Sequence, residues 1–140
     1  MLHRTRTCAV VASSLLVAGA LVGPAAAGTT ATAAGAKKVK ITVRCKAEGT
    51  TKVVGTSTGQ PFGKATVTGT LALPNATLTF TTKKGSATMT ASGRVAAGGK
   101  LAGSWQWQSG SGAYKGIKGK GTSSGDLGCQ PWLLKGTASY

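Results

Sequence analysis

The sequence predicts an all-β protein, an antiparallel β-barrel of about eight strands that follows a cleaved signal peptide. Three observations lead to this prediction. Apolar and polar residues alternate with a period of two in several segments, which is typical of strands with one buried face. Turn-forming residues separate these segments at short intervals, as in a meander of hairpins. No segment shows the spacing of an amphipathic helix, and threonine, which favours strands, is abundant throughout.

The clearest expected strand is 38–46, KVKITVRCK, in which apolar and polar side chains alternate along the whole length. Its apolar face consists of Val39, Ile41, Val43 and Cys45. Its other face is basic or hydroxylated and is expected to meet solvent. Six further segments show similar alternation or strand-like composition, and the sequence predicts strands at 51–57, 64–73, 76–82, 87–95, 101–108 and 132–139. The stretches PN, KKGS and AAGGK supply turns between them.

The segment 1–27 has the composition of a secretory signal peptide. Two arginines precede an uncharged apolar run at 9–22, and three small residues, Ala25–Ala27, end the segment. The run is shorter than the roughly 20 residues that a membrane-spanning helix needs, so we expect cleavage and no stable membrane span. Cleavage is expected after Ala27, although sites after Ala33 and Ala36 also fit the small-residue rule. The mature protein is therefore expected to be secreted and extracellular.

Cleavage leaves enough chain for one domain with one modest core and too little for two. Residues 28–37 have no periodicity and hardly any bulky side chains, so we expect them to form a flexible leader. Residues 38–140 are then expected to form the single barrel domain. The sequence does not indicate an oligomeric state.

The expected mature chain has few side chains for catalysis or metal binding. His3 leaves with the signal peptide, and Glu48 and Asp126 are the only acids in the sequence. General acid–base and nucleophilic catalysis need a histidine, a pair of carboxylates or a base beside the nucleophile. Zinc and calcium sites need clusters of ligands that this sequence does not supply. We therefore expect no catalytic residues of these kinds, no bound metal and no cofactor.

Two cysteines remain after cleavage, because Cys8 leaves with the signal peptide. In an exported protein a disulfide between Cys45 and Cys129 is the expected state, and two buried free thiols are the alternative. On the chain-entropy model, closing so long a loop would stabilise the fold by about 4–5 kcal/mol. The bond would also make the first strand a neighbour of the C-terminal segment, so that the sheet closes on itself.

Trp105 and Trp107 fall on the same face of the expected strand at 101–108. Two interpretations of this pair remain open. The rings could fill the core of a narrow barrel whose other inward residues are small or aliphatic, and this is the interpretation that we favour. Alternatively, together with Tyr114, they could line a pocket at the barrel mouth for a sugar ring or a flat apolar ligand.

The glycine-rich segment 110–122, GSGAYKGIKGKGT, does not match a nucleotide-binding loop, because the spacing is wrong and no helix follows. It resembles the G-x-G-x-[YF]-x-G-[AI]-x-G-x-G segment of the allene oxide cyclase-like and dirigent-like barrels, which include small exported bacterial proteins of unassigned activity. The similarity extends over about 76–125. It implies an eight-stranded antiparallel barrel in which this segment makes a tight corner before the next strand, with Tyr114 plugging the barrel end. The acidic and polar pocket residues behind the known activities of that superfamily have no counterparts in this sequence, so no activity is carried over.

Charge is the remaining indication of function. The chain contains 17 lysines and arginines against two acids, and only two of the basic residues lie in the expected signal peptide. Such a surface attracts anionic polymers, such as teichoic acid, acidic polysaccharide or nucleic acid bound without sequence specificity. The candidate binding residues lie along one strand face: Lys38, Lys40, Arg44 and Lys46. Alternatively, the charge serves only to keep an exported domain soluble.

The sequence thus favours a secreted, non-catalytic barrel that binds polyanions of the cell envelope or extracellular matrix. Such binding would depend on charge and would hardly discriminate among polymers of equal charge density. The alternative is an enzyme of the lyase or isomerase kind that acts on an apolar small molecule in a barrel cavity. An apolar cavity lined by Trp105 or Trp107 would favour the enzyme, and a filled interior with a continuous basic surface would favour the binding protein.

Overall fold

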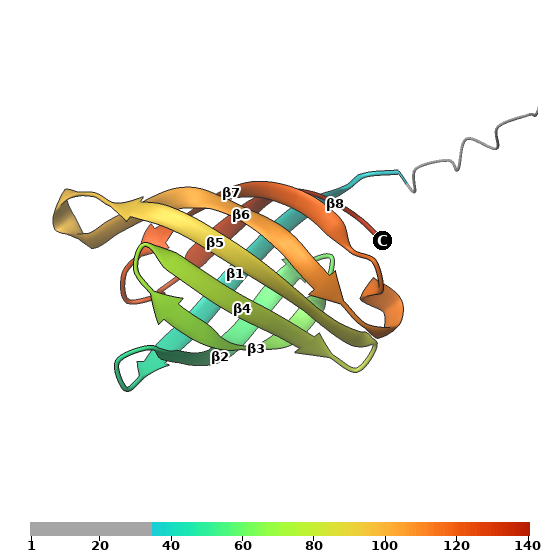
Figure 1. Cartoon of the computed structure of the whole chain (residues 1–140), viewed down its shortest axis with the longest axis horizontal. Coiled ribbons are helices and arrows are strands. Elements are labelled where there is room, and N and C mark those ends of the chain that lie inside the picture. Colours follow the sequence, from blue (N-terminus) through green and yellow to red (C-terminus); the bar gives the residue numbers. More distant parts are fainter. Residues whose placement is uncertain (1–34) are drawn as a thin grey trace, which may run out of the picture.

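The computed structural model describes residues 35–140, in which eight antiparallel strands form a closed barrel (Figure 1). The expected signal peptide, 1–27, and residues 28–34 of the expected leader lie outside the described residues. The strands are β1 Lys37–Glu48, β2 Lys52–Gln60, β3 Gly63–Ala72, β4 Asn75–Thr82, β5 Gly85–Val95, β6 Lys100–Gly110, β7 Lys118–Asp126 and β8 Trp132–Ser139. Two short 3₁₀ turns, η1 Ala97–Gly99 and η2 Gly112–Tyr114, flank β6.

Each strand pairs with the next along the chain, and β8 pairs with β1 to close the barrel. This confirms the expected fold class and the expected proximity of the first strand to the C-terminal segment. All seven segments that the alternation predicted overlap a strand. The eighth strand, β7, was expected only as the strand that follows the glycine-rich corner. Its inward positions are Gly119, Gly121, Ser123 and Gly125. These residues are small, so the sequence of β7 does not show the alternation of apolar and polar side chains by which the other strands were predicted.

The two ends of the barrel differ in charge. At one end β1 begins and β8 finishes, and we call this the basic end because six lysines and no acid lie there: Lys37, Lys64, Lys83, Lys84, Lys115 and Lys118. At the opposite end, the disulfide end, lie the loop between β7 and β8 and both acids, Glu48 and Asp126. Figure 1 shows the β5–β6 hairpin extending beyond the rest of the barrel at this second end.

Aromatic rings fill the interior towards the basic end. Phe62 lies in the turn between β2 and β3 and stacks on Phe80 with the ring centroids 5.3 Å apart. Trp107 meets Phe80 edge-on at 5.6 Å, and η2 brings Tyr114 to 4.7 Å from Phe62. Tyr114 is buried, so this ring closes the barrel at the basic end.

Glycines in β7 and β8 provide the space for Trp105. Trp105 pairs with Gly121, and Gly121 pairs in turn with Gly136 on β8. A Cβ atom built on Gly121 or Gly136 would lie 2.7 or 2.8 Å from Cζ2 of the indole. The indole nitrogen donates a hydrogen bond to the carbonyl oxygen of Thr122 at 3.0 Å. Gly121 and Gly136 therefore leave room for a large ring close to the barrel wall.

Replacing Gly121 with alanine should reduce the free energy of unfolding by about 1–3 kcal/mol, because the new methyl group would clash with the indole and with the Lys135 carbonyl. Gly128→Ala is the matched control, since a Cβ at Gly128 would meet nothing within 4 Å. Its effect should stay within about 0.5 kcal/mol. Urea denaturation followed by far-ultraviolet circular dichroism measures both values. Equal stability of the two variants would contradict the packing role of Gly121.

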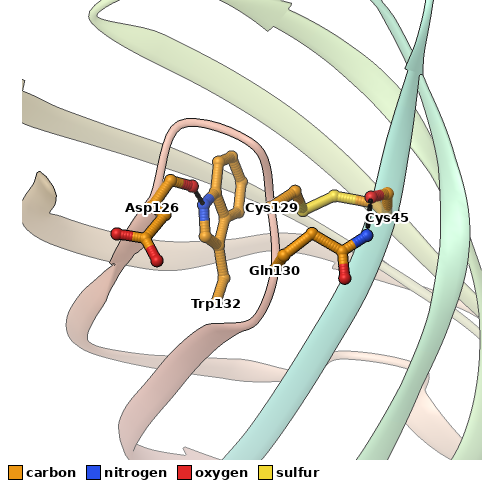
Figure 2. The surroundings of a disulfide bond; sticks show 5 residues. All are labelled: Cys45, Asp126, Cys129, Gln130 and Trp132. Carbon is orange, nitrogen blue, oxygen red and sulfur yellow. Dashed lines mark hydrogen bonds between the residues drawn. A yellow bond between two sulfur atoms is a disulfide. The ribbon is translucent and has the colours of Figure 1, made fainter. Parts of the chain in front are cut away.

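A disulfide joins β1 to the loop between β7 and β8 (Figure 2). The Cα atoms of Cys45 and Cys129 are 5.2 Å apart. The Cys45 amide donates to the Cys129 carbonyl oxygen at 3.1 Å, and the Gln130 side chain donates to the Cys45 carbonyl oxygen at 3.2 Å. The expected pairing is therefore present, and the alternative of two free thiols is not. The same loop bends around Trp132, whose indole nitrogen donates to the Asp126 carbonyl oxygen at 2.6 Å.

Candidate functional site

The four basic residues singled out on the first strand all lie on the outer surface of β1. Lys38, Lys40, Arg44 and Lys46 are exposed, and the apolar residues that alternate with them point into the core. The alternation in the sequence therefore assigned these side chains to the correct face. Alternate residues of a strand are about 7 Å apart, so three lysines and an arginine form a row along the strand.

Barrel closure places three further lysines beside this row. Lys135 on β8 is the direct cross-strand partner of Lys40. Thr137 on β8 pairs with Lys38 on one side and with Lys120 of β7 on the other. The basic face is defined as the part of the outer surface of β7, β8 and β1 that carries Lys38, Lys40, Arg44, Lys118, Lys120 and Lys135. Lys46 continues the row on β1 towards the disulfide end, where Glu48 follows on the same face of the strand.

Sequence reasoning did not identify the lysines of β7 and β8 as part of a site. One signal was present, because Lys118 and Lys120 alternate with glycine and so share a face. Their proximity to Lys38 and Lys40 depends on the pairing of β8 with both β7 and β1. Neighbouring strands lie about 4.8 Å apart, so Lys120 and Lys38, separated by one strand, have Cα atoms about 10 Å apart.

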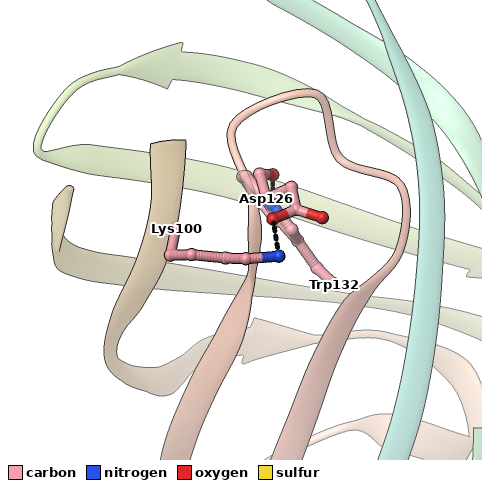
Figure 3. Close-up of polar contacts among 3 residues, drawn as sticks. All are labelled: Lys100, Asp126 and Trp132. Carbon is pink, nitrogen blue, oxygen red and sulfur yellow. Dashed lines mark hydrogen bonds and ion pairs between the residues drawn. The ribbon is translucent and has the colours of Figure 1, made fainter. Parts of the chain in front are cut away.

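The acids of the described chain lie at the disulfide end, where Glu48 ends β1 and Asp126 ends β7. Lys52 pairs with Glu48 at 3.6 Å, and Lys100 pairs with Asp126 at 2.7 Å, as Figure 3 shows for the second pair. Both pairs are exposed and contribute little to stability. Within residues 35–140, no ion pair involves a lysine or arginine of the basic face. Within the described chain, the lysines and the arginine of this face therefore keep their charge free of a direct carboxylate partner, and the face has a net positive charge.

The residues proposed as a candidate pocket, Trp105, Trp107 and Tyr114, are core residues with 2, 7 and 4% of their surface exposed. The two indoles contact each other edge-on at 5.3 Å. Trp105 also borders an open groove on the outer surface, but its burial leaves no ring face on which a sugar could stack. This burial agrees with the core interpretation that we favoured for the tryptophan pair.

An apolar cavity does lie in the barrel, but at the disulfide end. It has a volume of about 20 Å³ and is lined by residues that include Leu71, Met89, Leu101 and Trp132, but neither Trp105 nor Trp107. A volume of this size holds about one water molecule. A small-molecule site usually has about 300 Å³ or more, so this cavity is too small for a substrate.

Within residues 35–140, no helix is long and apolar enough to cross a membrane. In the same part of the chain, no three histidine, cysteine or acidic side chains are grouped so that they could hold a metal ion. A scan of the chain against protein-family models found no match, and searches among curated proteins and among solved structures found none either.

Proposed function

We propose that this protein is a secreted, non-catalytic barrel that binds anionic polymers of the cell envelope or extracellular matrix through its basic face. The observation that carries the proposal is the gathering of exposed lysines from three adjacent strands, with Lys40 directly beside Lys135. Both acids lie at the disulfide end of the barrel, where each forms an ion pair with a lysine outside the basic face. A fully solvated, one-signed surface of this kind attracts polyanions over the distance of a Debye length, about 8–10 Å in physiological salt.

Binding at such a face gains free energy chiefly by releasing the counterions condensed on the polymer. Lysine supplies a flexible point charge that needs no fixed partner geometry, so polymers of several chemistries can meet the same face. Each side chain that neutralises one anionic group contributes to the salt dependence of the affinity. The basic face alone is therefore expected to recognise charge density and not sequence or sugar identity.

The filled interior favours this role over the lyase or isomerase alternative. A catalytic barrel needs a cavity in which to hold its substrate, and the apolar cavity of about 20 Å³ has no room for one. The disulfide is consistent with a protein that functions in an oxidising compartment. The resemblance to the allene oxide cyclase-like barrels remains a prediction, and the proposal does not depend on it.

Replacing Lys38, Lys40 and Arg44 together by glutamine should flatten the salt dependence of polyanion binding. With polyphosphate as the probe, the slope of log K against log salt should fall by about 2–3, since each lost contact removes nearly one released counterion. The melting temperature should hardly change, because these side chains are exposed. Affinity is measured by fluorescence titration at several salt concentrations.

The matched control replaces Lys52, Arg94 and Lys100 by glutamine, which removes the same charge from outside the basic face. This control should keep a slope close to that of the unmodified protein. Equal flattening in both variants would show that net charge alone, and not the basic face, determines binding. Failure of the unmodified protein to bind polyphosphate at low salt would refute the proposed function.

A further inference from the structure

A second polar surface lies next to the basic end, outside the basic face. A groove of about 640 Å³ runs over the outer surface of β2, β3 and β4 and is lined mainly by threonines. A second groove of about 500 Å³ lies at the rim of the barrel and is lined by Gln60 and Lys84, among others. The two grooves share Lys64, Thr82 and Lys83, so they adjoin each other, and together they are called the threonine groove.

The strand register builds a row of hydroxyl groups across this groove. Thr66 of β3 pairs with Thr56 of β2 on one side and with Thr81 of β4 on the other. All three residues are exposed, and neighbouring strands lie about 4.8 Å apart. None of the side-chain hydrogen bonds found within residues 35–140 uses these three hydroxyls. Each hydroxyl can therefore both donate and accept a hydrogen bond with a ligand.

Lysines provide charge where the groove reaches the basic end. Lys64 and Lys83 line both parts of the groove, and Lys84 lines the rim. Within residues 35–140, the ion pairs found use none of these three lysines. The threonine groove thus has positive charge where it reaches the basic end and neutral hydroxyl groups elsewhere. This combination suits a polymer that carries both anionic groups and many hydroxyls.

The aromatic residues argue against nucleic acid as the natural occupant. Binding of single strands relies on exposed rings on which bases stack. Within residues 35–140, six of the seven aromatic side chains are buried: Phe62, Phe80, Trp105, Trp107, Tyr114 and Trp132. The seventh, Tyr140, is partly exposed and has the Lys37 ammonium 4.2 Å from its ring centre. A partner that needs hydroxyl and charge contacts but no stacking fits this surface better.

We propose that the threonine groove binds a segment of a linear anionic polysaccharide. Sugar hydroxyls exchange hydrogen bonds with the row of Thr56, Thr66 and Thr81, and the anionic groups meet Lys64 and Lys83. This inference rests on the proposed function and names the class of polyanion. The basic face supplies salt-dependent attraction that is common to all polyanions, and the groove adds contacts that only a hydroxyl-bearing polymer can make.

The test replaces Thr66 and Thr81 with valine, which keeps the shape of both side chains and removes their hydroxyls. The probes are alginate, a linear uronic-acid polymer, and polyphosphate, which has charge but no sugar hydroxyls. In about 0.5 M salt, where screening weakens the charge contacts, alginate should still bind and polyphosphate should not. The double variant should then bind alginate about tenfold more weakly, as expected for the loss of two or three hydrogen bonds.

Thr70→Val with Thr77→Val is the matched control, because this pair is cross-strand on the same two strands but outside the groove. The control should bind alginate as the unmodified protein does. Thr66→Ser with Thr81→Ser should restore binding, since serine keeps the hydroxyl. Circular dichroism melting of every variant separates a loss of binding from a loss of folding.

Three results would overturn the inference. One is that alginate and polyphosphate lose binding over the same range of salt and the valine pair has no effect. The second is that the groove and control variants weaken alginate binding equally. The third is that single-stranded DNA binds more tightly than alginate at equal charge density. The proposed function survives all three results, because polyphosphate binding at low salt and the comparison of the two glutamine variants test it separately.

Discussion

Replacing Trp105 with alanine should reduce the free energy of unfolding by about 3–5 kcal/mol, the usual loss for a large aromatic side chain in a core. The indole is almost fully buried, contacts Trp107 and donates a hydrogen bond to the Thr122 carbonyl oxygen at 3.0 Å. Its removal leaves a cavity against Gly121 and Gly136, and glycines have no side chains that could move in to fill it. Equilibrium denaturation in urea measures the loss.

Trp107→Phe provides the control for this variant. Within the described residues the Trp107 indole nitrogen is buried without a hydrogen-bond partner, so phenylalanine removes an unsatisfied donor and keeps an aromatic ring. This change should cost less than about 1.5 kcal/mol.

In the native state, the fluorescence of Trp105 and Trp107 in a Trp132→Phe background should resist quenching by acrylamide. Ready quenching of both would contradict the burial of the pair.

Removing the disulfide should have an effect of similar size. Cys45→Ala, made together with Cys129→Ala so that no free thiol remains, should cost about 2–5 kcal/mol. The bond closes a loop across a sequence separation of 84 residues and holds the β7–β8 loop against β1. Its loss therefore increases the conformational entropy of the unfolded chain and also loosens the attachment of this loop in the folded barrel. Thermal melting under oxidising and reducing conditions measures the loss.

Lys100→Gln tests whether an ion pair at the same end of the barrel contributes as much to the free energy of unfolding as the disulfide. Lys100 reaches from β6 to Asp126 at the end of β7 (Figure 3), but the pair is exposed, so its loss should cost less than about 1 kcal/mol. The mass of the intact unreduced protein should be two hydrogens lower than that of the reduced chain. Free thiols on the purified native protein would contradict the disulfide, and equal losses in the two variants would contradict its dominant role.

Local alternation was sufficient to predict most of the strands. A period of two places every second side chain on one face, so Val39, Ile41 and Val43 could be assigned to the core and Lys38 and Lys40 to solvent. β7 does not show this signal, because its inward positions are glycine and serine. The small size of these residues is explained by Trp105, which packs against them from β6. A contact between strands had to be known before the composition of β7 could be explained.

The sequence by itself determined the fold class, the cysteine pair, the outward row on β1 and the scarcity of catalytic side chains. Only the tertiary structure decided that Lys120 and Lys135 lie beside Lys38 and Lys40, that Thr56, Thr66 and Thr81 form one row, and that aromatic rings fill the basic end. The physical reason is that the face of a side chain follows from its position within its own strand. Its neighbours across the sheet follow from backbone hydrogen bonding between distant segments and from the register that barrel closure imposes.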